Sequence, residues 1–290
     1  MNYKFTGLLL LTITLSVTLF GQQGKQTALN ANQIIDLVKK HVNCPWSAET
    51  VDTFKSGNPD DLITGIEVCM FADMKALKQA ATDKCNLIIV HEPTFYSHLD
   101  ETKTYENDPV YQGKRKFIND NKLIIWRFHD HIHRTKPDGI YVGMIEKLGW
   151  KQNQTDSSMI RFRFESQKLS QFISRLKSAF PGSTFRVVGN PEMKVTNVAL
   201  AVGAPGSTGH IKLLREENID LLIAGEAPEW ETYQYVYDAL LLEKNKAVIF
   251  LGHTNSEEAG MNYCARWLKG FIPKDIPIKY FENGSSFVTY

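Results

Sequence analysis

One short apolar run followed by two metal-binding side chains constrains this chain more than any other feature. Leu87 to Val90 is continuously apolar, which predicts a buried central strand. His91 and Glu92 follow it directly, and Pro93 then biases Glu92 towards an extended backbone. Open α/β sheets place their sites at the carboxyl ends of such strands. This stretch therefore predicts a polar site at the end of a buried strand.

Two later apolar runs end in similar side chains. These side chains are His129, His131 and His133 after residues 123–128, and His253 and Glu257 after residues 247–251. Each group also has a structural interpretation: the alternating histidines fit one solvated face of a strand end, and residues 254–257 fit a capping box for a helix starting at Glu257. However, five of the eight histidines follow three apolar runs, each with a carboxylate close by. That coincidence favours one metal site.

The spacing of these residues favours two ions over one. His91 and Glu92 are adjacent, so in a regular strand they point to opposite faces and suit a single ion poorly. Two ions roughly 3.5–4 Å apart, bridged by carboxylates, would use both. Imidazole and carboxylate ligands suit zinc, iron or manganese, and the absence of a cysteine ligand argues against a closed structural zinc site. We expect two divalent ions, with zinc as the first choice and iron or manganese as alternatives.

The two halves of the chain repeat the same order of features. Residues 86–93 (NLIIVHEP) are echoed by residues 220–228 (DLLIAGEAP), and residues 123–133 by residues 247–257. Each half then reads as strand, helix, strand ending in Glu, helical region, strand ending in His, and helix. The predicted fold class is α/β, with two facing, pseudo-duplicated lobes that contain βαβ units. The first lobe spans residues 30–150 and the second residues 159–290, joined by a linker-like segment at residues 151–158.

Turn and helix signals complete this outline. Residues 97–108 are charged and lack periodicity, which predicts a surface loop. Ser166 is a candidate cap for a helix over residues 167–180. Gly203 to Gly209 is a glycine-rich turn opening a helix, but it lacks the Lys-Ser/Thr ending of a P-loop and is a weak nucleotide signal. The four cysteines match no zinc spacing and predict buried free thiols.

The N-terminus has the form of a secretory signal. Lys4 precedes an apolar and hydroxylated run from Phe5 to Phe20, and 16 residues is short for a membrane span, which needs roughly 20. We expect residues 1–21 to be removed and the chain to be periplasmic or secreted, with no stable membrane span left; a retained anchor is the alternative. Removal takes away only Lys4 among charged residues, leaving 32 basic and 32 acidic residues. This balance predicts no nucleic-acid partner.

The ordered features resemble those of the NIF-three-like dinuclear-metal proteins, some of which are labelled GTP cyclohydrolase I type 2 homologues. The similarity runs from about Asn32 to the C-terminus. In the family, the first strand ends in His-His-Pro, a later strand in His-Thr-Asn-Leu-Asp, then come Thr-Gly-Glu and Gly-His-x-x-Ser/Thr-Glu. His91 matches the first ligand, Glu92 stands where a second His is usual, and residues 224–226 match Thr-Gly-Glu. The remaining matches are His129, His133 (where an Asp is usual), His253 and Glu257.

The two departures compensate each other, because Glu replaces His at position 92 and His replaces Asp at position 133. The third-strand segment is one residue longer than the family pattern, so His129, His131, His133 and Asp138 all remain candidates there. The resemblance implies a two-domain α/β protomer in a homo-oligomer, commonly a hexameric ring. Two functions follow as hypotheses: a metal-dependent hydrolase of a small molecule, with metal-bound hydroxide as nucleophile, and a non-catalytic metal-binding assembly protein. The sequence identifies no other catalytic residue.

Overall fold

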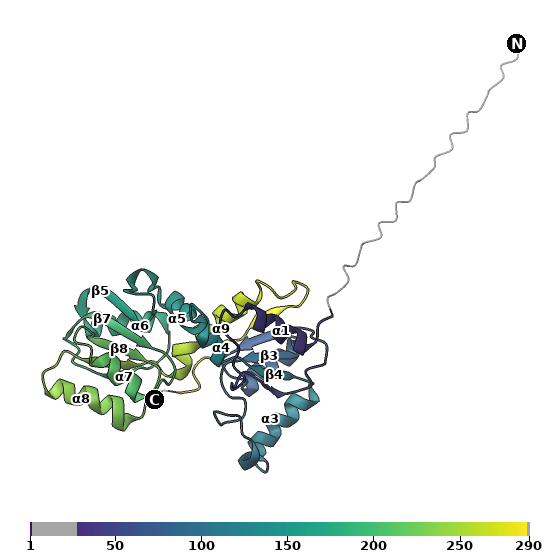
Figure 1. Ribbon diagram of the computed structural model, residues 1–290, viewed down its shortest axis with the longest axis horizontal. Coiled ribbons are helices and arrows are strands. Elements are labelled where there is room, and N and C mark those ends of the chain that lie inside the picture. The colour runs from purple at the N-terminus through teal and green to yellow at the C-terminus, as the bar shows by residue number, and fades with distance from the viewer. Residues whose placement is uncertain (2–27, 289–290) are drawn as a thin grey trace.

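The chain folds into two five-stranded sheets, which form two lobes that lie side by side (Figure 1). The computed structural model describes residue 1 and residues 28–288. The predicted signal segment at residues 1–21 therefore falls almost wholly outside the described residues. Among the residues that are described, no helix is long and apolar enough to cross a bilayer.

The first sheet has the strand order β1-β4-β3-β2-β10. Its strands are β1 (Phe54–Ser56), β2 (Ile66–Cys69), β3 (Leu87–Val90), β4 (Ile124–Arg127) and β10 (Ile278–Tyr280). Strands β2, β3, β4 and β10 are parallel, and β1 joins β4 antiparallel. The helices that precede, connect or follow these strands are α1 (Ala31–His41), α2 (Met74–Thr82), α3 (Pro109–Asp120), α4 (Asp130–Arg134) and α5 (Gly139–Leu148). Every residue of β2, β3 and β4 is buried, including the charged Glu67 and Arg127, and only β3 is apolar throughout.

The second sheet has the order β5-β7-β8-β9-β6. Its strands are β5 (Arg161–Lys168), β6 (Arg186–Val188), β7 (Lys194–Ala201), β8 (Leu221–Ala224) and β9 (Ala247–Phe250). Strands β7, β8 and β9 are parallel, while β5 and β6 flank them antiparallel. The helices are α6 (Leu169–Ala179), α7 (Ser207–Leu214), the π-helix η3 (Glu229–Tyr233), α8 (Gln234–Leu241) and α9 (His253–Leu268).

The two sheets repeat one arrangement, which confirms the predicted α/β class with duplicated lobes. In each, three parallel strands stand in reverse chain order, β4-β3-β2 and β9-β8-β7, and a short antiparallel strand, β1 or β6, closes the side next to the third of them. The outer strands differ, because β5 is antiparallel to β7 whereas β10 is parallel to β2. The segment 159–290, predicted as the second lobe, thus ends in the first sheet.

Side-chain caps fix several of the helix starts. Asn30 forms a capping box with Gln33 at the start of α1, and Asp73, Asp108 and Asp138 accept hydrogen bonds from the first-turn N–H groups of α2, α3 and α5. The predicted cap Ser166 is wrong. Gln167 and Lys168 still pair with β7, so β5 continues past Ser166 and α6 begins only at Leu169.

Helices α5 and α9 cross at two glycines where the lobes meet (Figure 1). A Cβ atom on Gly143 would lie 2.2 Å from the carbonyl oxygen of Ala259, and one on Gly260 would lie 2.5 Å from Cα of Ile140. Real Cβ atoms do not approach backbone so closely. The absence of a side chain at both positions therefore lets the two helices touch backbone to backbone. All four cysteines are free, and three of them are buried.

Candidate metal centre

The end of β3 delivers two side chains to the junction of the lobes. His91 is fully buried, and its Nε2 lies 3.5 Å from Oε2 of Glu257. Glu92 is also buried, and its Oε1 lies 2.9 Å from Nε2 of His253. Both contacts join the first lobe to α9. The residues predicted from the first strand therefore meet those predicted from the last.

The histidines after β4 lie in a short helix and at its N-cap, so the alternative interpretation as one solvated face of a strand end is wrong. The Asp52 carboxylate accepts hydrogen bonds from the backbone N–H groups of His129, Asp130 and His131, at 2.7–2.8 Å, and so caps the start of α4. One helical turn then separates His129 from His133, which places both on the same side. Their rings lie 4.6 Å and 5.1 Å from the His91 ring, measured between centroids.

The two other third-strand candidates are occupied by structural contacts. His131 is fully buried, with Nδ1 2.7 Å from Asp52 Oδ2 and Nε2 accepting from the Ser47 N–H at 2.9 Å, and its ring stacks on Trp46. Asp138 caps α5, and its Oδ2 lies 3.0 Å from Nδ1 of His133. The geometry therefore favours His129 and His133 over His131 and Asp138 as ligands.

Helix α9 supplies the last two side chains from its N-terminal end. It begins at His253, not at Glu257, because Gly252 adopts a φ of 86° at the N-cap; residues 254–257 are thus not a capping box. His253 Nε2 lies 3.0 Å from Glu257 Oε2, and Glu257 Oε1 lies 3.6 Å from His133 Nε2. Gly203 packs against this carboxylate, since a Cβ there would lie 2.2 Å from Glu257 Oε1. The glycine-rich turn thereby leaves space for Glu257.

In all four histidines of the cluster the same ring nitrogen, Nδ1, is engaged by an oxygen atom. Each Nδ1 lies within 3.1 Å of an oxygen atom: the Phe128 carbonyl for His91, Asp130 for His129, Asp138 for His133 and Glu226 for His253. Such contacts orient metal-binding histidines and leave Nε2 for the ion. Among the described residues, His91 Nε2 is also buried without a hydrogen-bond partner. This unsatisfied atom suits a cation, because buried polar atoms otherwise find partners.

The electrostatics of the cluster hold its carboxylates ionised. Burial alone would raise the pKa of Glu92, but the hydrogen bond with His253 and the nearby His91 outweigh it and lower this pKa to about 2. Burial would likewise raise the pKa of Glu257, but His253 and His91 outweigh burial and hold this pKa well below the usual carboxyl range. Both groups therefore offer negative charge to a cation at neutral pH.

The histidines differ in how they balance that charge. Burial and the neighbouring His91 lower the pKa of His129 to about 4. Burial also lowers the pKa of His133, but the contact with Asp138 outweighs it and the net shift is upward. For His253, three carboxylates outweigh burial and raise the pKa to about 12, so a proton holds them together when no cation is bound. A divalent ion would replace this proton.

The ligand atoms form two overlapping groups. One contains His91, His129 and His133, and the other His91, Glu92 and Glu257; within each group the ligand atoms lie within 4.8 Å of one another. The two Glu257 oxygens face different histidines, His133 on one side and His91 with His253 on the other. Residues from both lobes could thus hold metal.

Sequence reasoning gave no role to several residues around this cluster. Asp52 caps α4 from 77 residues away, and no local pattern marks it. Glu226 was matched to a family motif but not predicted to orient His253. Buried Arg127 and exposed His98 also lie at the cluster, and His98 falls in the predicted surface loop.

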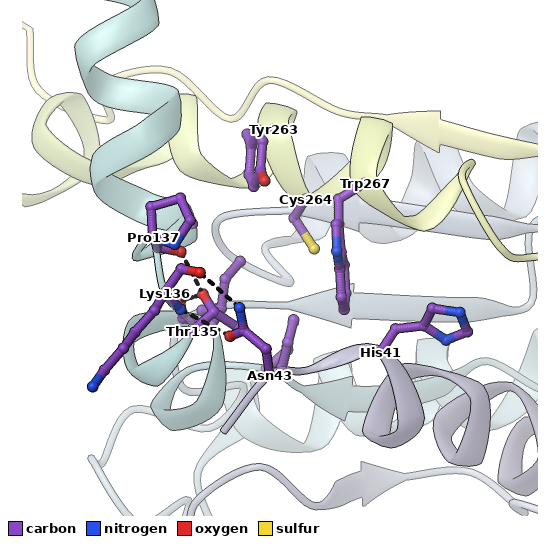
Figure 2. Close-up of a pocket in the computed structure, with 11 residues that line it drawn as sticks. His41, Asn43, Thr135, Lys136, Pro137, Tyr263, Cys264 and Trp267 are labelled. Carbon is purple, nitrogen blue, oxygen red and sulfur yellow. Dashed lines mark hydrogen bonds between the residues drawn. The ribbon is translucent and has the colours of Figure 1, made fainter. Parts of the chain in front are cut away.

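One small cavity lies away from these ligands. Figure 2 shows it between the end of α1, the turn after α4, and α9, beside Asn43, Pro137 and Trp267. It encloses about 70 Å³, and none of the six predicted ligands lines it. Ligand pockets commonly enclose some 300–1,000 Å³. This cavity is therefore separate from the cluster and small for a substrate.

A duplicated α/β fold with a histidine–glutamate cluster between its lobes defines a class of two-lobed proteins able to hold metal. The chain belongs to the Duf34/NIF3 (NGG1p interacting factor 3) family, whose sequence profile matches residues 29–283. This confirms the resemblance to the NIF-three-like proteins.

Individual relatives agree with this membership. A GTP cyclohydrolase 1 type 2 homolog from Chlamydia pneumoniae is 24% identical over 226 residues, which cover 75% of this chain and 84% of the relative. A Bacillus cereus protein related to NIF3 superposes with a TM-score of 0.74 at 13% identity, over 91% of this chain and all of that one. A hypothetical protein from Staphylococcus aureus gives 0.71 at 15% identity, over 91% and 99% of the two chains. At these identities the solved structures support the fold alone.

Proposed function

We propose that this chain is an exported, metal-dependent hydrolase of a small molecule, with two divalent ions between its lobes. His91, Glu92, His129, His133, His253 and Glu257 would hold the ions, and zinc suits this donor set best, ahead of iron or manganese. The ligands come from β3, α4 and α9, so the site is complete only when the two lobes are together.

The observation that carries the proposal is the common orientation of the four histidines. Every Nδ1 is engaged by an oxygen atom, which leaves every Nε2 for an ion, and the buried Nε2 of His91 has no hydrogen-bond partner among the described residues. A cluster built only for stability would pair its buried atoms. No cysteine stands among these ligands, which supports an open site over a closed structural one.

The residues of the chain divide the work of such a site. Neutral His129 and ionised Glu92 need no proton change to bind a cation near pH 7, because their pKa values are depressed. Glu257 presents its two oxygens to opposite sides, as a bridging carboxylate must. Glu226 holds His253 in one ring orientation. Bound divalent ions would supply Lewis acidity towards a substrate oxygen and towards water.

The test measures metal first and activity second. Elemental analysis after zinc loading and dialysis should give two ions per chain, and Glu257→Gln should lower this content. The matched control is His41→Ala, which removes an exposed histidine at the end of α1 and should leave the content unchanged. The zinc form is then screened with phosphomonoester, phosphodiester, ester and amide probes. Full metal content without turnover of any probe would favour a non-catalytic metal-binding assembly protein.

We also propose that the chain forms a homo-oligomer. Large apolar side chains gather on η3 and α8, with Trp230 76% exposed and Leu241 67% exposed. Patches of this kind commonly mark interaction surfaces. A hexamer is the expectation from the family resemblance. Analytical ultracentrifugation tests it, and a monomer at every concentration would contradict it.

A further inference from the structure

The loop that follows β3 brings a further histidine to the edge of the cluster. The His98 side chain is exposed, and its ring lies 6.0 Å from the ring of His129, measured between centroids, in an edge-to-face arrangement. The other histidines around this point are buried or half-buried and are predicted ligands. His98 therefore faces solvent where a substrate would approach the centre.

One buried guanidinium ties this loop to the metal-binding strand. Arg127, at the end of β4, is fully buried; its Nε donates to the His91 carbonyl at 3.0 Å and its NH1 to the His98 carbonyl. Its charge is compensated by Glu92 at 3.6 Å and Asp100 at 3.8 Å. Because burying a charge is costly, an arginine in this position implies that the relative placement of His91 and His98 is specified.

Further charged side chains fix the loop from its other side. Asp100 accepts from the Phe95 N–H at 2.8 Å and lies 3.4 Å from Nζ of Lys55. The Lys114 ammonium donates to the Thr94 carbonyl at 2.6 Å, and burial lowers the pKa of this lysine to about 8. A solvated surface loop would not need buried lysines. Residues 94–100 are thus held as a shaped element.

The backbone of the loop is also unusual. Tyr96 and Asp100, on either side of His98, have φ values of 61° and 57° in the left-handed region. Residues other than glycine adopt this region at a cost in conformational free energy, and residues in such conformations concentrate at functional sites. The contacts of Arg127 and Lys114 hold the conformation against that cost.

We propose that residues 94–100 form a wall of the substrate site and that His98 is the residue through which this wall binds the substrate. The inference rests on the proposed hydrolase function, because it requires a substrate at the metal centre. The His98 ring would donate a hydrogen bond to an oxygen-bearing anionic or polar group of the substrate at the metal centre. Arg127 and Asp100 hold the backbone of the loop that carries this ring.

Inorganic phosphate is the probe, titrated calorimetrically into the zinc-loaded protein. His98→Ala should weaken phosphate binding roughly tenfold or more, the usual loss for a hydrogen bond to a charged group. His98→Gln keeps a side-chain donor and should restore part of the affinity. His41→Ala is the matched control, because it removes an exposed histidine at the end of α1, outside this loop and the cluster, and should bind phosphate normally.

A second measurement reports contact directly. The His98 ring signals in nuclear magnetic resonance spectra, identified by their loss in His98→Gln, should shift when phosphate is added to the zinc form, and a purely structural histidine would not respond. Native zinc-loaded protein that binds no phosphate, or His98→Ala that binds it with native affinity and full zinc content, overturns the proposal. A native protein that takes up no zinc refutes the hydrolase function instead, so the two failures are distinguishable.

Discussion

Replacing Gly260 with alanine should destabilise the protein, although alanine is the better helix former. Gly260 is buried on α9, and a new Cβ would lie 2.5 Å from Cα of Ile140 on α5. Ordinary contact begins near 3.4 Å, so the two helix backbones would have to separate by roughly 1 Å. Overpacking of this kind costs about 1–3 kcal/mol, which exceeds the gain of about 1 kcal/mol in helix propensity.

Gly113 provides the matched control on α3. It is exposed, and a Cβ there would meet no atom within 4 Å, so Gly113→Ala should raise the free energy of unfolding by about 1 kcal/mol. Urea unfolding measures both variants, and melting temperatures should move by about 2–4 °C per kcal/mol. Gly260→Ala should also lower zinc content, because Glu257 lies one turn away on α9. A Gly260→Ala protein as stable as Gly113→Ala would refute the close crossing.

Three further predictions test the ligands, the pH response and the leader. Glu92→Ala and His133→Ala should each lower zinc occupancy, measured by elemental analysis, and full occupancy in both would refute their assignment as ligands. Glu92→His combined with His133→Asp should retain more zinc than either exchange alone, because each single exchange alters the ligand charge. Without metal, the pKa of His129 in the folded protein is depressed to about 4. Between about pH 6.5 and pH 4 the unfolded chain therefore binds more protons than the folded one, so the free energy of unfolding falls as the pH is lowered through this range. Urea unfolding of chelator-treated protein should show a flatter fall for His129→Gln, and an unchanged slope would contradict the shift. N-terminal sequencing of protein from its native host should find residues 1–21 removed, and an intact start would end the export proposal.

The central parallel strands could be predicted because short apolar runs in the sequence mark them. Leu87–Val90 is a strand with those bounds, and β4, β8 and β9 fall within one or two residues of their apolar runs. Strand β10 was not predictable as part of the first sheet. Its pairing with β2 joins residues more than two hundred positions apart, which periodicity cannot report.

Within the cluster, too, local sequence marks some residues and long-range contacts determine others. Histidines and carboxylates after apolar runs could be identified, because strand ends converge in α/β folds. The choice between His129, His131 and His133 depended on α4, and α4 depends on a cap from Asp52 that lies far away in the chain. His98 was placed in a solvent-exposed loop because the buried charges that shape that loop, Arg127 and Lys114, come from β4 and α3.

The return of the chain to the first sheet has a consequence for biosynthesis. When the first 252 residues have left the ribosome, the β3 and α4 ligands are present, but His253 and Glu257 are not. The first sheet also still lacks its edge strand, because β10 spans residues 278–280. Domains generally fold in order from the N-terminus during synthesis, but here the first sheet gains its edge strand only when almost the last residues have been made. An exported chain of this design would acquire metal from the compartment in which it finishes folding, and not from the one in which it is translated.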